Sequence, residues 1–177
     1  MEKYLHIKIS KDIKLSPLLE SDAPDVLRLV NENRINLAKY LYWVKDVSDI
    51  ASAHKYIFER VNSGKSGSRW FKINFKGKFC GVFAIKSICP DSAVAELGYW
   101  LAQNAHGNGI ISQIISKAPQ LLTGTHVKFI EFRCLERNEA SIKVALKSGA
   151  LLVDVIPNFL VADNVLQNLN IYRTPVK

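Results

Sequence analysis

Several kinds of feature are missing from this 177-residue sequence. It has three cysteines, Cys80, Cys89 and Cys134, an odd number without CxxC spacing, so neither a disulfide framework nor a zinc site is indicated. No apolar run is long enough to cross a bilayer, and the charged N-terminus does not resemble a signal peptide. These absences predict a protein of a reducing, cytoplasmic compartment, with no membrane contact and no metal.

Runs of like charge are also missing, although 24 Lys and Arg against 16 Asp and Glu give a net charge of +8. A basic balance favours an acidic partner, such as nucleic acid, an acidic protein or a polyphosphate ligand. It is equally typical of an ordinary basic soluble protein. Because no run of five like charges marks a nucleic-acid tail, nucleic acid is the disfavoured partner.

The chain has no internal repeat, low-complexity tract or long linker, and 48% of its residues are hydrophobic. This length supports one domain with a substantial core, so we expect a single domain over residues 1–177.

The hydrophobic pattern changes period along the chain. Residues before a loop at 62–68 have helical spacing, with one helix capped by Ser21 or Asp22 and a second from about 48 to 61. After the loop, alternation predicts three antiparallel strands near 71–75, 79–85 and 94–101. A helix then begins at Ile110 and is kinked or ended by Pro119.

The last third of the chain again combines segments of helical spacing with segments of strand-like alternation. It predicts a strand over 127–135, a helix over 138–148 and two strands near 150–156 and 165–173. In the helix, Asn138 is the expected N-cap, and Ile142, Ala145 and Leu146 are expected to face inward. With a first strand near 7–18, this order predicts an α+β fold built on a mixed sheet.

A glycine-spaced turn joins the strand at 94–101 to the following helix. Gly107 and Gly109 allow close approach of a ligand, and the first amides of a helix have no internal partners and lie at its positive end. The residue where a Rossmann site wants a third glycine is Ser112, and no P-loop Gly-Lys-Ser/Thr follows. The turn therefore predicts either a short phosphate cradle for a nucleotide-like cofactor or a tight turn without a ligand.

Two motifs carry a resemblance to a known family. Ala-Glu-Leu-Gly-Tyr-Trp-Leu with His-Gly-Asn-Gly-Ile-Ile-Ser, and Cys-Leu-Glu-Arg-Asn-Glu-Ala-Ser-Ile at 134–142, resemble the GCN5-related N-acetyltransferases (GNAT), most of all the RimJ/RimL ribosomal-protein group. The likeness covers most of residues 70–173. It implies a single-domain GNAT fold with a mixed, mostly antiparallel sheet flanked by helices, and acetyl-CoA as co-substrate.

The resemblance also implies where acetyl-CoA would bind. The pantetheine arm would enter a V-shaped split between the strands ending at Leu101 and Leu135. Asn138 would cap its helix and reach the pantetheine, or would act as a cap alone. The arm would bond the backbone of Trp100 and Leu101, and the pyrophosphate would bond the amides of His106, Gly107, Asn108, Gly109 and Ile110.

The implied reaction is direct attack of a neutral amine on the thioester, which requires a base and is helped by an acid. Glu96 is the candidate base, and its alternative is a structural charge paired with a lysine or arginine. Ser141 is the candidate donor to the sulfur, with Tyr99 and Tyr172 as further donors.

The expected function is acetyl transfer to a primary amine, above all the N-terminal α-amine of a protein such as a ribosomal protein. The alternatives are a small-molecule amine acetyltransferase and a catalytically impaired CoA-binding regulatory protein. The last is motivated by the lack of a carboxylate around Leu160, where related proteins often have one. A homodimer is a further expectation.

Overall fold

The structure is a computed structural model that describes residues 6–176. One mixed sheet has the strand order β1-β2-β3-β4-β5-β6-β8-β7, and β5 and β6 run parallel while the other neighbours run antiparallel. The strands are β1 (Ile7–Lys8), β2 (Ile13–Pro17), β3 (Arg69–Phe75), β4 (Lys78–Cys89), β5 (Val94–Leu101), β6 (Phe129–Leu135), β7 (Leu151–Ala162) and β8 (Val165–Pro175).

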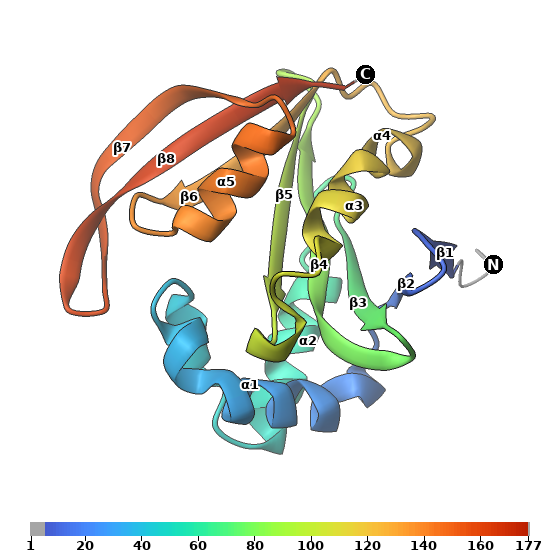
Figure 1. The fold of residues 1–177 in the computed structure, drawn as a ribbon, viewed down its shortest axis with the longest axis vertical. Coiled ribbons are helices and arrows are strands. Elements are labelled where there is room, and N and C mark those ends of the chain that lie inside the picture. Colours follow the sequence, from blue (N-terminus) through green and yellow to red (C-terminus); the bar gives the residue numbers. More distant parts are fainter. Residues whose placement is uncertain (1–5, 177) are drawn as a thin grey trace.

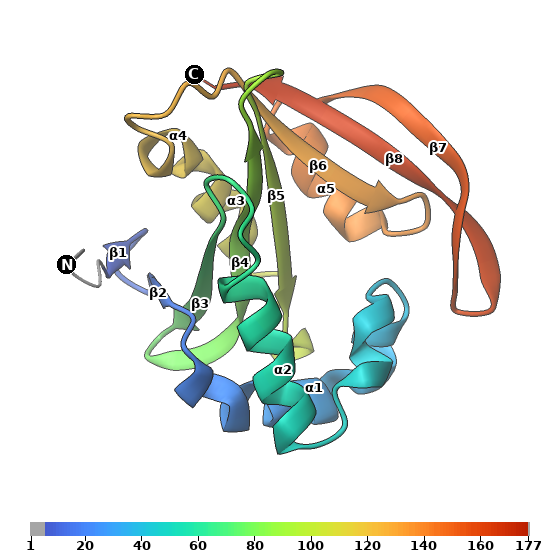
Figure 2. The same ribbon diagram turned by 180° about the vertical axis from the view of Figure 1, so that it is seen from behind.

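Helices cover the two faces of this sheet unequally. The helices α1 (Ala23–Ala38) and α2 (Ile50–Val61) lie on one face, and α3 (Ile110–Ser116), α4 (Ala118–Leu121) and α5 (Glu139–Lys147) lie on the other (Figures 1 and 2). Three short 3-10 turns precede or connect them, at Glu20–Asp22, Tyr42–Asp46 and Gln103–Ala105. On the side seen in Figure 2, no described helix lies over β6, β7 and β8.

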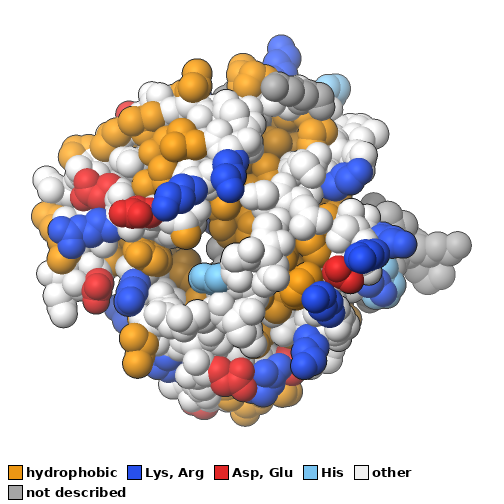
Figure 3. Space-filling view, in the orientation of Figure 1, with side chains coloured by type: hydrophobic (Ala, Val, Ile, Leu, Met, Phe, Trp, Pro, Cys, Tyr) orange, Lys and Arg blue, Asp and Glu red, His pale blue; other side chains and the backbone are white. Residues whose placement is uncertain are grey.

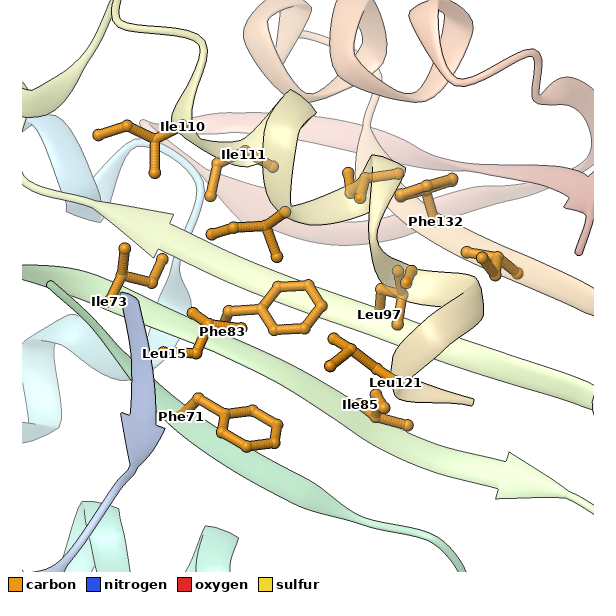
Figure 4. Close-up of a cluster of buried hydrophobic side chains, with 14 of the residues drawn as sticks. Leu15, Phe71, Ile73, Phe83, Ile85, Leu97, Ile110, Ile111, Leu121 and Phe132 are labelled. Atoms are coloured by element: carbon orange, nitrogen blue, oxygen red, sulfur yellow. The ribbon is translucent and has the colours of Figure 1, made fainter. Parts of the chain in front are cut away.

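The sheet and the helices enclose two apolar cores. The larger one lies under α3, α4 and α5, where Ile110, Ile114 and Phe132 pack with Phe83 (Figure 4). The second lies under α1 and α2 and includes Trp100. Because successive strand residues point to opposite faces, β5 contributes Leu97 to the first core and Trp100 to the second.

The α+β fold and the elements from the loop at 62–68 to the helix at 138–148 are confirmed. The Lys76–Gly77 turn of the β3–β4 hairpin has two positive φ angles, 49° and 78°, as a tight hairpin turn requires. The helix after the glycine turn breaks at Lys117, before Pro119, into α3 and α4.

The first strand was expected to be continuous from 7 to 18 and is instead two short strands. The Ser10 hydroxyl accepts the amides of Asp12 and Ile13, and the Ile13 carbonyl accepts the amide of Ile9, so the chain turns back between β1 and β2. The first strand is therefore a small hairpin at the edge of the sheet.

Of the two N-cap residues expected for α1, the structure has Asp22, but without a capping bond, and the inward position expected for Leu146 is wrong. Asp22 stands at the N-cap of α1 but makes no bond to its amides; its carboxylate accepts the Leu19 amide at 2.8 Å and the Lys72 ammonium at 2.6 Å. Leu146 is 53% exposed, because α5 packs on β6 and β8 and this side chain points away from both.

The terminal strands are longer than expected. β7 continues past Pro157 through an irregularity between Ile156 and Leu160, and the turn at Asp163–Asn164 has φ angles of 52° and 59°. Pro157 has no N–H to give to a neighbour, and the irregularity lets the strand continue past it.

Candidate active site

The two parallel strands separate in the middle of the sheet. They pair from Val94 with Phe129 to Leu97 with Phe132, and beyond these pairs β5 keeps only β4 and β6 keeps only β8. The result is a V whose wide end opens toward the end of α1, while α5 lies along its β6 arm (Figure 1), and the space-filling view has an opening through the molecule there (Figure 3). The split expected between these strands is present.

The glycine turn lies next to the end of β5. Gly107 and Gly109 have φ angles of 77° and 65°, and Gly109 is the N-cap of α3. A Cβ at Gly107 would meet no atom within 4 Å, so the turn is open at this point. The Asn108 side-chain amide donates to the carbonyls of Ala105 and His106, both at 3.1 Å, and holds the turn in shape.

Most of the amides expected to hold a pyrophosphate are free. Among the described residues, no hydrogen bond is formed by the amides of Gly107, Asn108, Gly109 and Ile110. The exception is His106, whose amide donates to the Gln103 carbonyl at 3.1 Å. Its ring nitrogen lies 3.2 Å from the Leu101 carbonyl, so His106 fastens the turn to the end of β5.

Helix α1 holds the same loop from the other side. The Asn33 side chain accepts the Gln103 amide at 2.8 Å, and the Asn36 side chain donates to the Gln103 side chain. The sequence analysis missed these contacts, whose only signal is two asparagines three residues apart on one helix face.

Trp100 lines the split with its backbone, whereas its side chain lies in the core. The indole donates to the Tyr56 hydroxyl at 3.0 Å and lies 5.9 Å from the Trp43 ring, within the core of α1 and α2. The Arg60 guanidinium stacks on Tyr56 at 3.7 Å. This aromatic group fixes the end of β5 against the helices.

The start of α5 closes the opposite wall of the V. The Asn138 side chain accepts the Ser141 amide at 3.3 Å, which confirms Asn138 as the N-cap. The cap sets the first turn of α5 and with it the place of the Ser141 hydroxyl.

Tyr99 and Ser141 meet across the split. The Tyr99 hydroxyl is buried and makes no hydrogen bond. Burial raises its pKa well above the usual range, and the nearby Ser141 hydroxyl lowers it in part. Cys134 is close to Tyr99, and burial raises the pKa of its thiol to about 12, so it is a neutral thiol at pH 7.

Glu96 lies at the closed end of the V within a charged network. Its carboxylate accepts the Lys86 ammonium and lies 3.8 Å from the Arg133 guanidinium. On β6, the buried Glu131 accepts from Arg133 and Arg173, both at 2.7 Å. Glu96 thus has the lysine and arginine partners that we would expect if it were only a structural charge. Its role as a base stays a prediction.

A separate cavity of about 690 Å³ lies between α1, the β3–β4 hairpin and Asn104. None of its lining residues belongs to β6 or α5, so it does not open into the split. Arg28, on its wall, is paired with Asp25 at 3.2 Å and Glu32 at 3.3 Å, whereas Lys76 and Lys78 line the same cavity and form no ion pair with a described residue.

The described residues contain no group of three or more His, Cys, Asp or Glu that could hold a metal ion. They also contain no helix long and apolar enough to span a membrane.

Comparison with known proteins decides the family. The acetyltransferase (GNAT) domain matches residues 12–151, most of the chain. The chain belongs to the GNAT family. This acetyltransferase is 26% identical over 169 residues to the ribosomal-protein-serine acetyltransferase of Escherichia coli (strain K12), covering 94% of each chain. A putative ribosomal N-acetyltransferase of Bacillus subtilis (strain 168), YdaF, is 24% identical over 117 residues, which cover 62% of this chain and 61% of that one.

Solved structures share the GNAT architecture. RimL, a ribosomal L7/L12 alpha-N-protein acetyltransferase in complex with coenzyme A, superposes with a TM-score of 0.88 at 22% identity, covering 97% of this chain and 98% of that chain. The microcin C7 self-immunity acetyltransferase MccE, in complex with acetyl-CoA and AMP, gives a TM-score of 0.86 at 27% identity over 96% of both chains. The expected family, fold and enzyme class are confirmed.

The contribution of the Asn138 cap to the free energy of unfolding can be measured by mutation. We expect Asn138→Ala to lower the free energy of unfolding by about 1 kcal/mol, because one amide of α5 loses its partner. Asn138→Ser, which keeps a capping oxygen, should cost less. Urea denaturation of both variants checks this, and equal stability of Asn138→Ala and wild type would contradict the cap.

Proposed function

We propose that the protein binds acetyl-CoA with its pantetheine arm in the β5–β6 split and transfers the acetyl group to the N-terminal α-amine of a protein, such as a ribosomal protein. The observation that carries the proposal is the split itself, with free amides at one end and the unpartnered Tyr99 hydroxyl inside. The relatives that are named for ribosomal proteins support the choice of acceptor, and a cytoplasmic reaction is part of the proposal.

The residues fit acetyl-CoA in two places. The arm carries amide groups that pair with the backbone of β5 at Trp100 and Leu101, which has no strand partner on the β6 side. The diphosphate is held by the free amides of Gly107 to Ile110, where the positive end of α3 adds to the attraction. Asn138 caps α5 and would reach the pantetheine.

The transfer is a single displacement. The amine nitrogen attacks the carbonyl carbon of the thioester, the C–S bond breaks, and the sulfur leaves with its electron pair. Glu96 takes the proton of the amine through a water molecule, and the Ser141 and Tyr99 hydroxyls donate hydrogen bonds to the leaving sulfur. Burial raises the pKa of Tyr99, so its hydroxyl is protonated at pH 7 and can donate this hydrogen bond.

A second candidate acceptor is a small molecule carrying a primary amine. Its support is the likeness to MccE, whose structure is a complex with acetyl-CoA and AMP. The third candidate is a CoA-binding protein without transfer activity. Its support is the lack of a carboxylate around Leu160 in the last hairpin, because the nearest one in the sequence, Asp163, lies in the turn.

One experiment separates the three. Wild-type protein is incubated with acetyl-CoA and, in parallel, with peptides that have the N-termini of ribosomal proteins and with small primary amines. Release of free CoA thiol and acetylation seen by mass spectrometry identify the acceptor class. Transfer to peptides alone supports the proposal, transfer only to small molecules replaces it, and calorimetric binding of acetyl-CoA without transfer favours the third candidate.

A carboxylate placed in the cradle should abolish cofactor binding. We expect Gly107→Glu to weaken acetyl-CoA binding by at least 100-fold, because it adds negative charge beside the diphosphate. Gly64→Glu is the matched control: its φ of 67° and open surroundings give the same strain and charge in the loop before β3. Calorimetry that finds equal affinities for both variants would show that the cradle lies elsewhere.

Removal of the base should slow transfer without loss of binding. We expect Glu96→Gln to lower kcat by about 10²–10⁴-fold, the usual contribution of a general base, with the KM for acetyl-CoA little changed. Lys86→Met is the control, since it breaks the same ion pair and leaves the carboxylate. If both variants lose activity equally, Glu96 acts only as a structural charge.

The hydroxyls that face the split can be tested by deletion. We expect Tyr99→Phe and Ser141→Ala each to lower kcat by at least 10-fold, since the leaving thiolate loses a hydrogen bond. Cys134→Ala should retain transfer within a few-fold, because direct attack uses no enzyme nucleophile. Steady-state kinetics with both substrates varied check this, and a ping-pong pattern would overturn the single displacement.

A further inference from the structure

Two arginine side chains lie where one face of β6 and β8 has no described helix over it. Arg133 of β6 and Arg173 of β8, called the arginine pair, are on the side of the sheet seen in Figure 2, because Phe132 and Tyr172 beside them point into the core under α3, α4 and α5. Their side chains are 43% and 42% exposed. Both guanidinium groups are therefore open to a ligand that approaches this face.

One buried carboxylate positions both guanidinium groups. Glu131 is 2% exposed, and its two oxygens accept Nε of Arg133 and Nε of Arg173, each at 2.7 Å. Glu131 and Arg173 are partners in the antiparallel register of β6 and β8, so the sheet itself fixes their contact. Because each bond uses Nε, the outer Nη groups of the arginine pair are left without a hydrogen bond to any residue between 6 and 176. The pair thus presents free donors in a fixed orientation.

The charges around the arginine pair do not cancel. The pair and Lys86 carry three positive charges, whereas their partners Glu96 and Glu131 carry two negative charges. Asp154 is the one other acidic residue of β6, β7 and β8, and its carboxylate accepts the Val155 amide at 2.8 Å instead of an arginine. One positive charge is left in excess at this place, which favours the binding of an anion.

The arginine pair lies next to the residue assigned to take the proton of the acceptor amine. Nε of Arg133 is 3.8 Å from the Glu96 carboxylate. A free Nη group and a bound anion add a few ångströms to that distance, and an extended peptide advances about 3.3–3.6 Å per residue. An anion at the arginine pair is thus roughly two or three residues away from an amine that meets Glu96 through a water molecule.

We propose that the arginine pair binds a carboxylate of the acceptor, so that the protein prefers peptides with Asp or Glu about two or three residues after the N-terminal amine. This inference rests on the proposed function, because it needs a peptide amine at Glu96. Two outer N–H groups of a guanidinium match the two oxygens of a carboxylate. The ammonium of Lys86 is instead bound to Glu96. The contact distinguishes acceptors of equal charge by their sequence, which the field of the whole protein does not do.

The test compares two acceptor peptides that differ only in Glu or Gln at the third and fourth residues. For the wild-type protein we expect kcat/KM to be about 10-fold higher with the Glu peptide, the lower end of the effect of a hydrogen bond to a charged group. Arg173→Gln together with Glu131→Gln should reduce this preference to about twofold or less, since one fork is lost and no buried carboxylate is left unpaired. A merely structural role would lower kcat/KM for both peptides alike.

Arg28→Gln is the matched control. Arg28 also has two carboxylate partners and a half-exposed side chain, but it lines the cavity that does not open into the split. This variant loses the same charge and should keep the full preference for the Glu peptide. Arg173→Lys guards against misfolding of the double variant: it keeps the charge beside Glu131 and loses the fork, so the preference should fall by several-fold. An unchanged preference in either Arg173 variant, or an equal loss in Arg28→Gln, would overturn the proposal.

Binding separates this inference from the proposed function. Fluorescence anisotropy with the same two peptides, labelled at the C-terminus, measures affinity in the presence of CoA whether or not transfer follows. Tighter binding of the Glu peptide to the wild type, lost in the double variant, supports the arginine pair, and a lack of acetylation would then count against the proposed function alone. Equal affinity of the two peptides for the wild type would overturn the arginine pair as a binding site, even if both peptides are acetylated.

Discussion

Strands β5 and β6 share four residue pairs, ending at Leu97 and Phe132, and the site follows from where this pairing stops. Each strand keeps an antiparallel neighbour on its outer side, so the separation exposes only the inner edges. Leu97 of β5, Phe132 of β6 and Ile114 of α3 belong to one core, which packs against both strands where their pairing ends. An extended chain that carries amides can pair with such an edge as a strand would. The same divergence therefore creates the slot in which we propose that the cofactor binds, and it brings the first turn of α5 opposite Tyr99.

The point of closure is fixed by charge as well as by packing. Parallel register places Glu96 beside Glu131 on one sheet face, an arrangement that is unfavourable for two carboxylates alone. Arg133 bridges both, and Arg173 brings β8 into the network. Glu131 is 2% exposed, so loss of its partners would leave a buried charge unpaired. The network is thus a clamp at the base of the V, and Glu96 is its member nearest to the separated part of β5.

The sequence determined the elements better than their mutual contacts. Alternation and helical spacing found the strand at 94–101 and the helix from 138, and asparagine chemistry identified the Asn138 cap, because these features depend on near neighbours in the chain. The partners of Glu96 could not be derived, since Lys86 and Arg133 come from different strands whose register is set by the whole sheet. The family resemblance supplied the split, which no local pattern encodes. The prediction that Leu146 faces inward was wrong for a related reason. Helical spacing shows which residues share a face of the helix, but not how far the sheet extends beneath that face.

The distribution of charge constrains how an acceptor is chosen. The cations at the base of the V, Lys86, Arg133 and Arg173, are each paired with a carboxylate, so the net charge of +8 is carried mainly elsewhere on the surface. An acidic partner is then attracted by the field of the whole protein, which ions screen over about 8 Å at physiological salt. Such attraction speeds encounter but does not distinguish one amine from another. Selection among amines must come from the shape of the split and from the contacts around it, because only these differ between acceptors of the same charge.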